Sequence, residues 1–247
     1  MTRLLSALLA AAGALPAATL LSSFHEGNSL FLRLSDGTAQ VDWLSDSSFH
    51  FTRRWDGNFV RSAARTGKAV DFKSSDTPQS LQIKTKYLTL TISKAGALVR
   101  VAEPDGTPIM TDITEAERRD GAVIWERAAG AETRFFGLGA REDSVIELRG
   151  TRTAALKPFL LSTAGYGESH VAPGHYIFDL ARAKKDRYRI EAHGADRVEY
   201  NFFFGPGPKE VFEQALLADR PIERLSPEIF RPLTDKDRKS TRLNSSH

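Results

Sequence analysis

Apolar and polar residues alternate with a period of two along most of this chain. Residues 29–34, 39–44 and 48–53 each place apolar side chains on one face and polar side chains on the other, as a half-buried β-strand does. The sequence SDGT at residues 35–38 supplies the Asp-Gly turn that a hairpin needs between the first two segments. The alternation recurs at residues 81–85, 88–93, 97–103, 122–127, 144–150, 175–180, 188–194 and 197–205.

Short strands separated by polar turns, with almost no helical periodicity, favour an all-β protein. A second Asp-Gly turn, PDGT, follows at residues 104–107. Patterns of this kind are typical of antiparallel sheets that pack face to face. We therefore expect a large antiparallel β-sandwich over residues 23–207.

The pattern changes at residues 205–221, GPGPKEVFEQALLADRP. Pro208 suits the first turn of a helix, and Glu210 is favoured near its positive end. This predicts a short helix that leads into a linker, over residues 208–236 in all. The apolar positions that would share one stripe of the helix are Val211, Phe212, Ala215 and Leu216.

Residues 1–20 have the character of a secretory signal peptide. Arg3 is followed by an Ala-rich apolar run that contains Gly13, Pro16 and several small residues. The alternative, a membrane anchor, is less favoured because the run is barely long enough to span a bilayer. The chain has no cysteine, so its fold depends on its core. We expect an exported bacterial protein, periplasmic or extracellular, with no membrane contact after cleavage.

The final segment, DRKSTRLNSSH at residues 237–247, has neither apolar periodicity nor an aromatic residue. It matches the translation of a sequencing adapter without a gap. We treat it as non-native and exclude it from the fold. The natural coding sequence is then expected to continue beyond residue 236.

The formal net charge of +3 does not belong to the predicted sandwich. The adapter-like tail contributes a net +2 and Arg3 a further +1, which leaves the remainder close to neutral. A nucleic-acid partner is therefore not expected.

Several motifs with catalytic potential are incomplete. The FGLG at residues 136–139 lacks the third glycine and the following helix of a dinucleotide loop, and a tight turn explains it better. Ser162 lacks the Gly-x-Ser-x-Gly context of a hydrolase. His170 and His175 are not at helical metal-ligand spacing and have no cysteine partner. We predict no metal and no cofactor.

Two sets of residues are candidates for acid–base catalysis. Glu168 with His170 or His175 could supply the acid and base of a sugar-mutarotase type of epimerase, although strand-end histidines are the simpler interpretation. Glycoside cleavage needs two suitably spaced carboxyl groups. The remaining candidates, Glu142 with Asp143, Glu117 with Asp120, and Asp76, lie in polar contexts typical of solvated surface charge. No catalytic residue is assigned.

Three segments, in this order, carry a family resemblance: ETRFFGLGARED (132–143), KPFLLSTAGYG (157–167) and EYNFFFGPGPKEVFEQ (199–214). Together they resemble the N-terminal β-sandwich of glycoside hydrolase family 31, the α-glucosidases and α-xylosidases. The likeness covers most of residues 25–220. It implies a galactose-mutarotase-like supersandwich that closes with an aromatic strand, Gly-Pro and a helix leading to a catalytic (β/α)8 barrel.

Two departures from the family pattern limit what can be transferred. Ala140 replaces the usual Glu of the FGLG turn, and only six residues separate Gly150 from Lys157, where many relatives have a longer loop over the sugar site. The positions that match the family, and are thus candidate substrate-binding residues with packing as the alternative role, are Arg141, Phe159 and Tyr166.

For the whole protein the resemblance implies a retaining α-glycosidase that acts on α-linked oligosaccharides. One Asp of the barrel would attack the anomeric carbon and a second would protonate the leaving oxygen. Both would lie beyond this chain, which is therefore expected to be inactive and to pack on the barrel.

A stand-alone carbohydrate-binding sandwich is the alternative from another class. Exposed tryptophans stack on sugar rings, and Trp55, beside a turn, is the best surface candidate. Trp43 and Trp125 alternate with apolar residues, so we expect both in the core.

Overall fold

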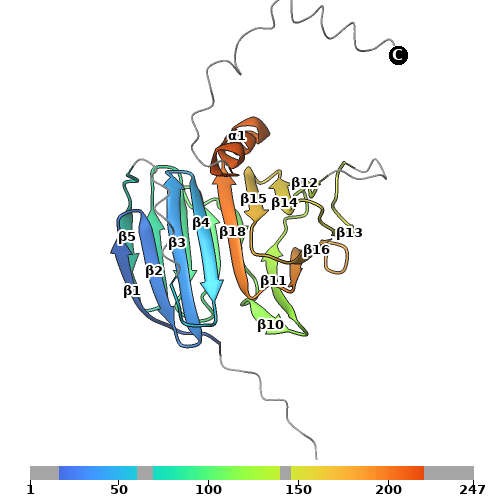
Figure 1. Cartoon of the computed structure of the whole chain (residues 1–247). Coiled ribbons are helices and arrows are strands. Elements are labelled where there is room, and N and C mark those ends of the chain that lie inside the picture. The colour runs from blue at the N-terminus through green and yellow to red at the C-terminus, as the bar shows by residue number, and fades with distance from the viewer. Residues whose placement is uncertain (1–16, 60–68, 140–145, 220–247) are drawn as a thin grey trace, which may run out of the picture.

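The computed structural model describes residues 17–59, 69–139 and 146–219. Within these ranges the chain forms three antiparallel sheets and one helix, α1 (Pro208–Asp219), near the C-terminal end (Figure 1). The prediction of an all-β sandwich followed by a short helix is confirmed. No helix in the described ranges has the length and apolar content to cross a membrane.

The largest sheet has eight strands and joins distant parts of the sequence. Strand β4 pairs with β18 in antiparallel register, with Phe51 opposite Tyr200. In spatial order, its strands are β1 (Leu20–Glu26), β2 (Ser29–Leu34), β3 (Gly37–Ser45), β4 (Ser48–Arg54), β18 (Arg197–Phe204), β15 (Tyr166–His170), β14 (Phe159–Ser162) and β12 (Phe135–Gly137).

Two smaller sheets of five strands each complete the fold. The second sheet is formed, in spatial order, by β10 (Glu117–Arg119), β11 (Ala122–Ala128), β17 (Arg187–His193), β16 (His175–Leu180) and β13 (Arg152–Ala154). The third is formed by β5 (Lys73–Asp76), β6 (Ser80–Lys84), β7 (Thr89–Ser93), β8 (Val99–Ala102) and β9 (Pro108–Thr111).

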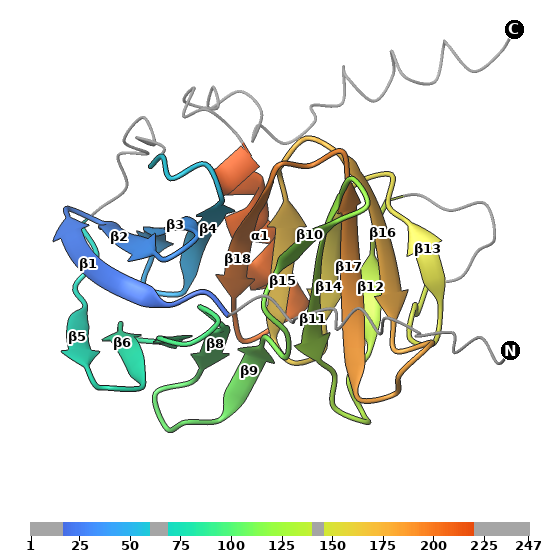
Figure 2. The ribbon, with the colours of Figure 1, turned by 90° about the horizontal axis from the view of Figure 1, so that it is seen from below.

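Both smaller sheets pack on the same face of the large sheet. Figure 2 shows β1–β4 facing the β5–β9 sheet. Between the large and second sheets, the hydroxyl groups of Tyr166 and Tyr188 are hydrogen-bonded to each other. The inward-facing residues of all three sheets form one continuous apolar cluster. Alternation along β2–β4 therefore reflects which side chains enter this apolar cluster, as predicted. On the other face of β3, the polar Thr38, Gln40 and Asp42 are also buried.

One predicted strand is wrong. Residues 146–150, the described part of segment 144–150, contain no strand. Instead, the Leu148 N–H donates to the Phe135 carbonyl (2.8 Å), Gly150 has a φ of +81°, and Ile146 is 78% exposed. The apparent alternation of this segment belongs to a loop that is anchored by the buried Leu148.

Strand β14 was missed because it does not alternate between apolar and polar residues. Leu160 points into the main core, whereas Phe159 and Leu161 face α1 on the other side of the sheet. A strand covered on both faces is apolar throughout, and its periodicity gives no signal.

At its N-terminal end, the large sheet begins a few residues earlier than the predicted sandwich. Residues 1–16 of the predicted signal peptide and residues 220–247, which include the linker and the adapter-like tail, lie outside the described residues. Strand β1 begins at Leu20, ahead of the predicted start of the sandwich at residue 23. Ala18, within the predicted leader, is buried.

Candidate functional site

Helix α1 packs on the outer face of the large sheet, over one end of β15 and β18 (Figure 1). Val211 and Ala215 are buried against Leu161 and Phe203. These residues form a small apolar cluster separate from the main core. The helix thus covers one end of the outer face of the large sheet.

Gly167 of β15 allows the helix to approach this closely. A Cβ atom at this position would lie 2.7 Å from Val211 Cγ1 and 3.0 Å from Phe159 Cζ, inside contact distance. The second glycine of the GYG motif is therefore required by helix packing.

Side-chain hydrogen bonds also hold α1 to the sheet. Gln214 Nε2 donates to the Phe204 carbonyl (2.9 Å), and the Ser47 hydroxyl, in the turn between β3 and β4, donates to Gln214 Oε1 (3.3 Å). The side-chain NH2 group and the side-chain carbonyl oxygen of Gln214 thus both have a hydrogen-bond partner. The helix is consequently fixed in orientation on the sheet.

The four residues predicted to share one stripe are divided between two sides of α1. Val211 and Ala215 face the sheet, whereas the other side of the helix leaves large apolar side chains uncovered. Phe212 is 45% exposed, Leu216 58% and Leu217 72%. They lie at i, i+4 and i+5, a spacing that places them on one side of a helix. We call these three residues the apolar stripe of α1.

The FGLG motif forms a tight turn at the end of β12, as predicted. Gly137, Leu138 and Gly139 all have positive φ angles of 103°, 63° and 95°. The Leu138 N–H donates to the Phe159 carbonyl (2.8 Å), and the Leu156 N–H donates to the Leu138 carbonyl (3.0 Å). This turn therefore lies directly beside the start of β14.

The family-matched residues have different environments. Phe159 is partly exposed, and its ring centroid lies 5.2 Å from that of Phe212 on α1. Tyr166 is 2% exposed, and its hydroxyl lies 2.9 Å from that of Tyr188. Contact between Tyr166 and a sugar would therefore require the core to open. Arg141, with Ala140, lies outside the described residues.

Two of the three tryptophans lie in the core, as expected, and the third is partly buried. Trp43 and Trp125 are buried in the core. Trp55 is partly buried, and the guanidinium carbons of Arg53 and Arg118 lie 4.8 Å and 5.9 Å from its ring centroid. Cation–π contacts therefore occupy the ring that a lectin would present to a sugar.

Glu168 belongs to a buried polar cluster between the sheets. Its Oε2 accepts a hydrogen bond from Arg127 Nη1, and its Oε1 accepts one from the Tyr188 hydroxyl (3.0 Å). Arg127 Nε also donates to Asp112 (2.9 Å). Burial raises the pKa of Asp112, although Arg127 opposes this shift. Burial alone would lower the pKa of Arg127, but its charged and polar neighbours raise it overall.

His170 lies in the same interior, without exposed surface. Burial, and then the charge of Arg127, lower its pKa well below the ordinary value. Its Nε2 is 3.5 Å from Glu168 Oε2, yet neither ring nitrogen makes a hydrogen bond. We therefore describe it as a neutral core histidine. His175 is exposed at the start of β16.

This arrangement gives a sugar no access to the proposed mutarotase-type pair. Glu168 is 0% exposed and its carboxylate already binds Arg127 and Tyr188. Ser162 is also buried, and its hydroxyl accepts the Ala164 N–H (3.2 Å). Neither residue is placed for acid–base or nucleophilic catalysis.

The carboxylates predicted to be surface charges are exposed where the structure describes them. Asp76 pairs with Lys94 (2.6 Å), and Glu117 lies 3.4 Å from Arg119. Asp120 is 92% exposed; Glu142 and Asp143 lie outside the described residues. Within the described ranges, no three His, Asp or Glu residues are grouped so as to hold a metal ion.

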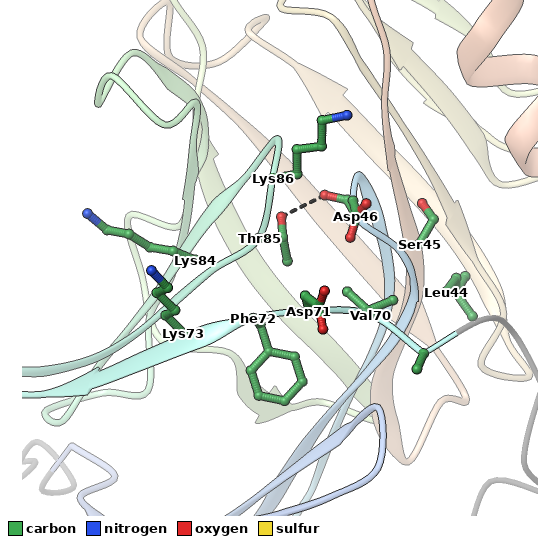
Figure 3. A pocket seen from close by; sticks show the side chains of 11 residues that line it. Leu44, Ser45, Asp46, Val70, Asp71, Phe72, Lys73, Lys84, Thr85 and Lys86 are labelled. Atoms are coloured by element: carbon green, nitrogen blue, oxygen red, sulfur yellow. Dashed lines mark hydrogen bonds between the residues drawn. The ribbon is translucent and has the colours of Figure 1, made fainter.

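A cleft of about 800 Å³ opens between the β3–β4 turn and the β5 and β6 strands (Figure 3). The Thr85 hydroxyl donates to the Asp46 carbonyl (2.6 Å) in its wall. Three lysines and two aspartates give the cleft a mixed charge, which differs from a shielded carboxyl pair. Its lining residues are Leu44, Ser45, Asp46, Ala69, Val70, Asp71, Phe72, Lys73, Lys84, Thr85 and Lys86.

These features define an all-β supersandwich with a helix at one end, which is a fold found in carbohydrate-active enzymes. The family-31 (GH31) dextranase of Flavobacterium johnsoniae, complexed with isomaltotriose, matches with a TM-score of 0.73 and 18% identity, over 83% of this chain and 28% of the dextranase. A GH31 α-xylosidase from a soil metagenome, complexed with xylose, matches with a TM-score of 0.66 and 13% identity, over 78% and 34%.

The cycloalternan-forming enzyme of Listeria monocytogenes, in complex with a pentasaccharide, has a TM-score of 0.64 at 17% identity and covers 77% of this chain and 21% of its own. No protein-family profile and no curated protein matches the sequence. The chain thus has the fold of part of these enzymes and spans about a fifth to a third of their length. The resemblance to glycoside hydrolase family 31 is confirmed at the level of the fold.

Proposed function

We propose that this chain is the non-catalytic N-terminal β-sandwich of an exported bacterial α-glycosidase of glycoside hydrolase family 31. The parent enzyme would hydrolyse α-glucosides or α-xylosides with retention of configuration. Support comes from the fold shared with a dextranase and an α-xylosidase of that family. The leader-like residues 1–20 support export.

The observation that carries this proposal is the apolar stripe of α1. Three large side chains exposed on one helix are unfavourable in water and mark a surface that another domain covers. Helix α1 ends at Asp219, so a domain joined after it would be linked close to this surface. We propose that the catalytic barrel covers the stripe and that this end of the sandwich forms one wall of the sugar site.

Substrate contact in the parent enzyme would then come from the same end. Phe159 lies beside α1 and the FGLG turn, and is partly exposed. The two aspartates required for retaining hydrolysis would be supplied by the barrel. An α-linked oligosaccharide would therefore be a partner of the full-length enzyme.

Two measurements test this proposal. The genomic DNA downstream of codon 236 should continue in frame into a (β/α)8 barrel. The 247-residue chain alone should not release nitrophenol from 4-nitrophenyl α-glucoside or α-xyloside, whereas the extended protein should. Hydrolysis by the short chain, or a natural stop after residue 247, would refute it.

The stand-alone carbohydrate-binding sandwich has less support. The ring of Trp55 already contacts two arginines. The aromatic residue that lines the mixed-charge cleft is Phe72, and its ring centroid lies 4.9 Å from that of His25.

A further inference from the structure

Ala18 is held by a carboxylate that is distant in the sequence. Its backbone nitrogen lies 3.0 Å from Glu115 Oε1 and 3.2 Å from Glu115 Oε2. An amide has a single hydrogen, which both oxygens must share. An ammonium group carries three hydrogens and could donate a separate, charge-assisted bond to each oxygen. The Glu115 carboxylate is therefore placed so that it could also bind a chain terminus at Ala18.

Among the described residues, hydrogen bonds to the sandwich are made from Ala18 onward. The Ala18 side chain is 2% exposed, and its carbonyl accepts the Gly96 N–H (2.6 Å). Thr19 exchanges two hydrogen bonds with Ser35, both of 2.9 Å, and the Leu20 N–H donates to the Lys94 carbonyl. Ala17, by contrast, is exposed. The change from an exposed to a buried residue therefore falls between Ala17 and Ala18.

We propose that signal peptidase cleaves the Ala17–Ala18 bond and that the new α-ammonium group of Ala18 forms an ion pair with Glu115. Hydrolysis of this peptide bond leaves the carboxylate on Ala17 and the amine on Ala18, with water as the co-reactant. Ala17 supplies the small residue directly before the cut, while Leu15 occupies the position two residues earlier, where secretory leaders usually carry a second small residue. This inference depends on the export that is part of the proposed function.

The surrounding charges are compatible with a cation at this position. Burial raises the pKa of Glu115, and the Ala18 N–H and Arg53 oppose this shift while Asp36 adds to it. Arg53 is already paired with Asp36 at 2.6 Å. Glu115 is thus the carboxylate left to receive the new terminus, and it would be stabilised in its ionised form by it.

The cleavage site can be read directly. The chain, with its own leader, is produced in a Gram-negative host, purified from the periplasm and analysed by N-terminal sequencing and intact mass. We expect one species that begins Ala-Thr-Leu. A terminus at Leu15, after the small pair Ala12 and Ala14, or at Thr19 would overturn this inference and leave the proposed function intact. Uncleaved protein confined to the cytoplasm would contradict both the cleavage site and the export that is part of the proposed function.

The ion pair is tested by acylation of the α-amine with an N-hydroxysuccinimide ester near neutral pH, quantified on the N-terminal peptide. Pairing keeps the amine protonated, so Glu115→Gln should react roughly fivefold faster or more, since each unit of pKa changes the free amine tenfold. Glu117→Gln, which alters an exposed carboxylate nearby, should react like the wild type.

Equal rates for Glu115→Gln and the wild type would refute the ion pair. If Glu115→Gln does not accumulate, the wild-type α-amine is titrated by NMR. A midpoint above the usual range of about 7.7–8.0 is expected. A midpoint within or below that range would also overturn the pairing.

Discussion

Arg127 of β11 and Glu168 of β15 form an ion pair in which neither side chain is more than 1% exposed. The pair joins the second sheet to the large sheet. Arg127 also donates to Asp112, which follows the last strand of the third sheet. One guanidinium group therefore connects all three sheets in the interior of the sandwich.

Replacing Glu168 by Gln should destabilise the fold strongly. The change would leave the buried Arg127 charge without its full partner, and breaking such a pair costs about 3–5 kcal/mol. Urea denaturation followed by tryptophan fluorescence measures the loss. Glu132→Gln, at a 92% exposed position, is the control and should have no measurable effect; equal stability of the two variants would contradict the structural role of Glu168.

His170 should make stability fall with acid. Its pKa is depressed in the folded state from an ordinary 6.5, so the unfolded chain binds more protons below that pH. The stabilising contribution is complete above pH 6.5 and is lost as the pH falls. His170→Leu should flatten this fall between pH 6.5 and 5 by up to about 1.4 kcal/mol per pH unit.

The comparison requires urea denaturation at several pH values, because the informative quantity is the slope of the free energy of unfolding against pH. His170→Leu also changes packing, but this affects stability at every pH. Exposed His175→Ala is the matched control and should retain the wild-type slope. An unchanged slope in His170→Leu would show that the residue is protonated in the folded protein.

Gly167→Ala should displace α1. The added methyl group would meet Val211 Cγ1 at 2.7 Å, and overpacking of this kind costs about 1–3 kcal/mol. Gly130→Ala is the control, since its nearest neighbour is the rotatable Thr133 hydroxyl at 3.2 Å. In the double variant Gly167→Ala/Val211→Ala the closest contact is removed while that with Phe159 remains, so the two losses should be less than additive. Additive losses would place the helix elsewhere.

The apolar stripe of α1 should cause self-association of the isolated chain. Leu216→Asp combined with Leu217→Asp should lower dye binding and shift the protein toward monomer in sizing chromatography, because both side chains are more than half exposed. Glu213→Gln, on the same helix, should change neither measurement. A wild-type chain that is monomeric and binds no dye would argue against a covering domain.

Trp55→Ala should not change oligosaccharide binding. Its ring packs with Arg53 and Arg118, so we expect only the loss of cation–π contact, about 0.5–1 kcal/mol of stability. Calorimetric titration with isomaltotriose measures the affinity. A clear loss of binding in Trp55→Ala, with the fold retained, would revive the lectin alternative.

Strands with one side facing the apolar core could be predicted from local pattern. Segments 29–34 and 48–53 correspond closely to β2 and β4, since the core-facing side must be apolar and this imposes a period of two on the sequence itself. The helix at Pro208–Asp219 was equally predictable from its proline and apolar spacing. The three family-like segments were enough to infer the supersandwich.

Contacts between distant segments were decided only by the tertiary structure. No local pattern reveals that β4 pairs with β18 or that β14 is covered on both faces. The sequence makes Glu168 a candidate catalytic base because His170 and His175 lie close to it along the chain. Its partners, Arg127 and Tyr188, come from other strands, and only their convergence in the interior makes this carboxylate part of the core.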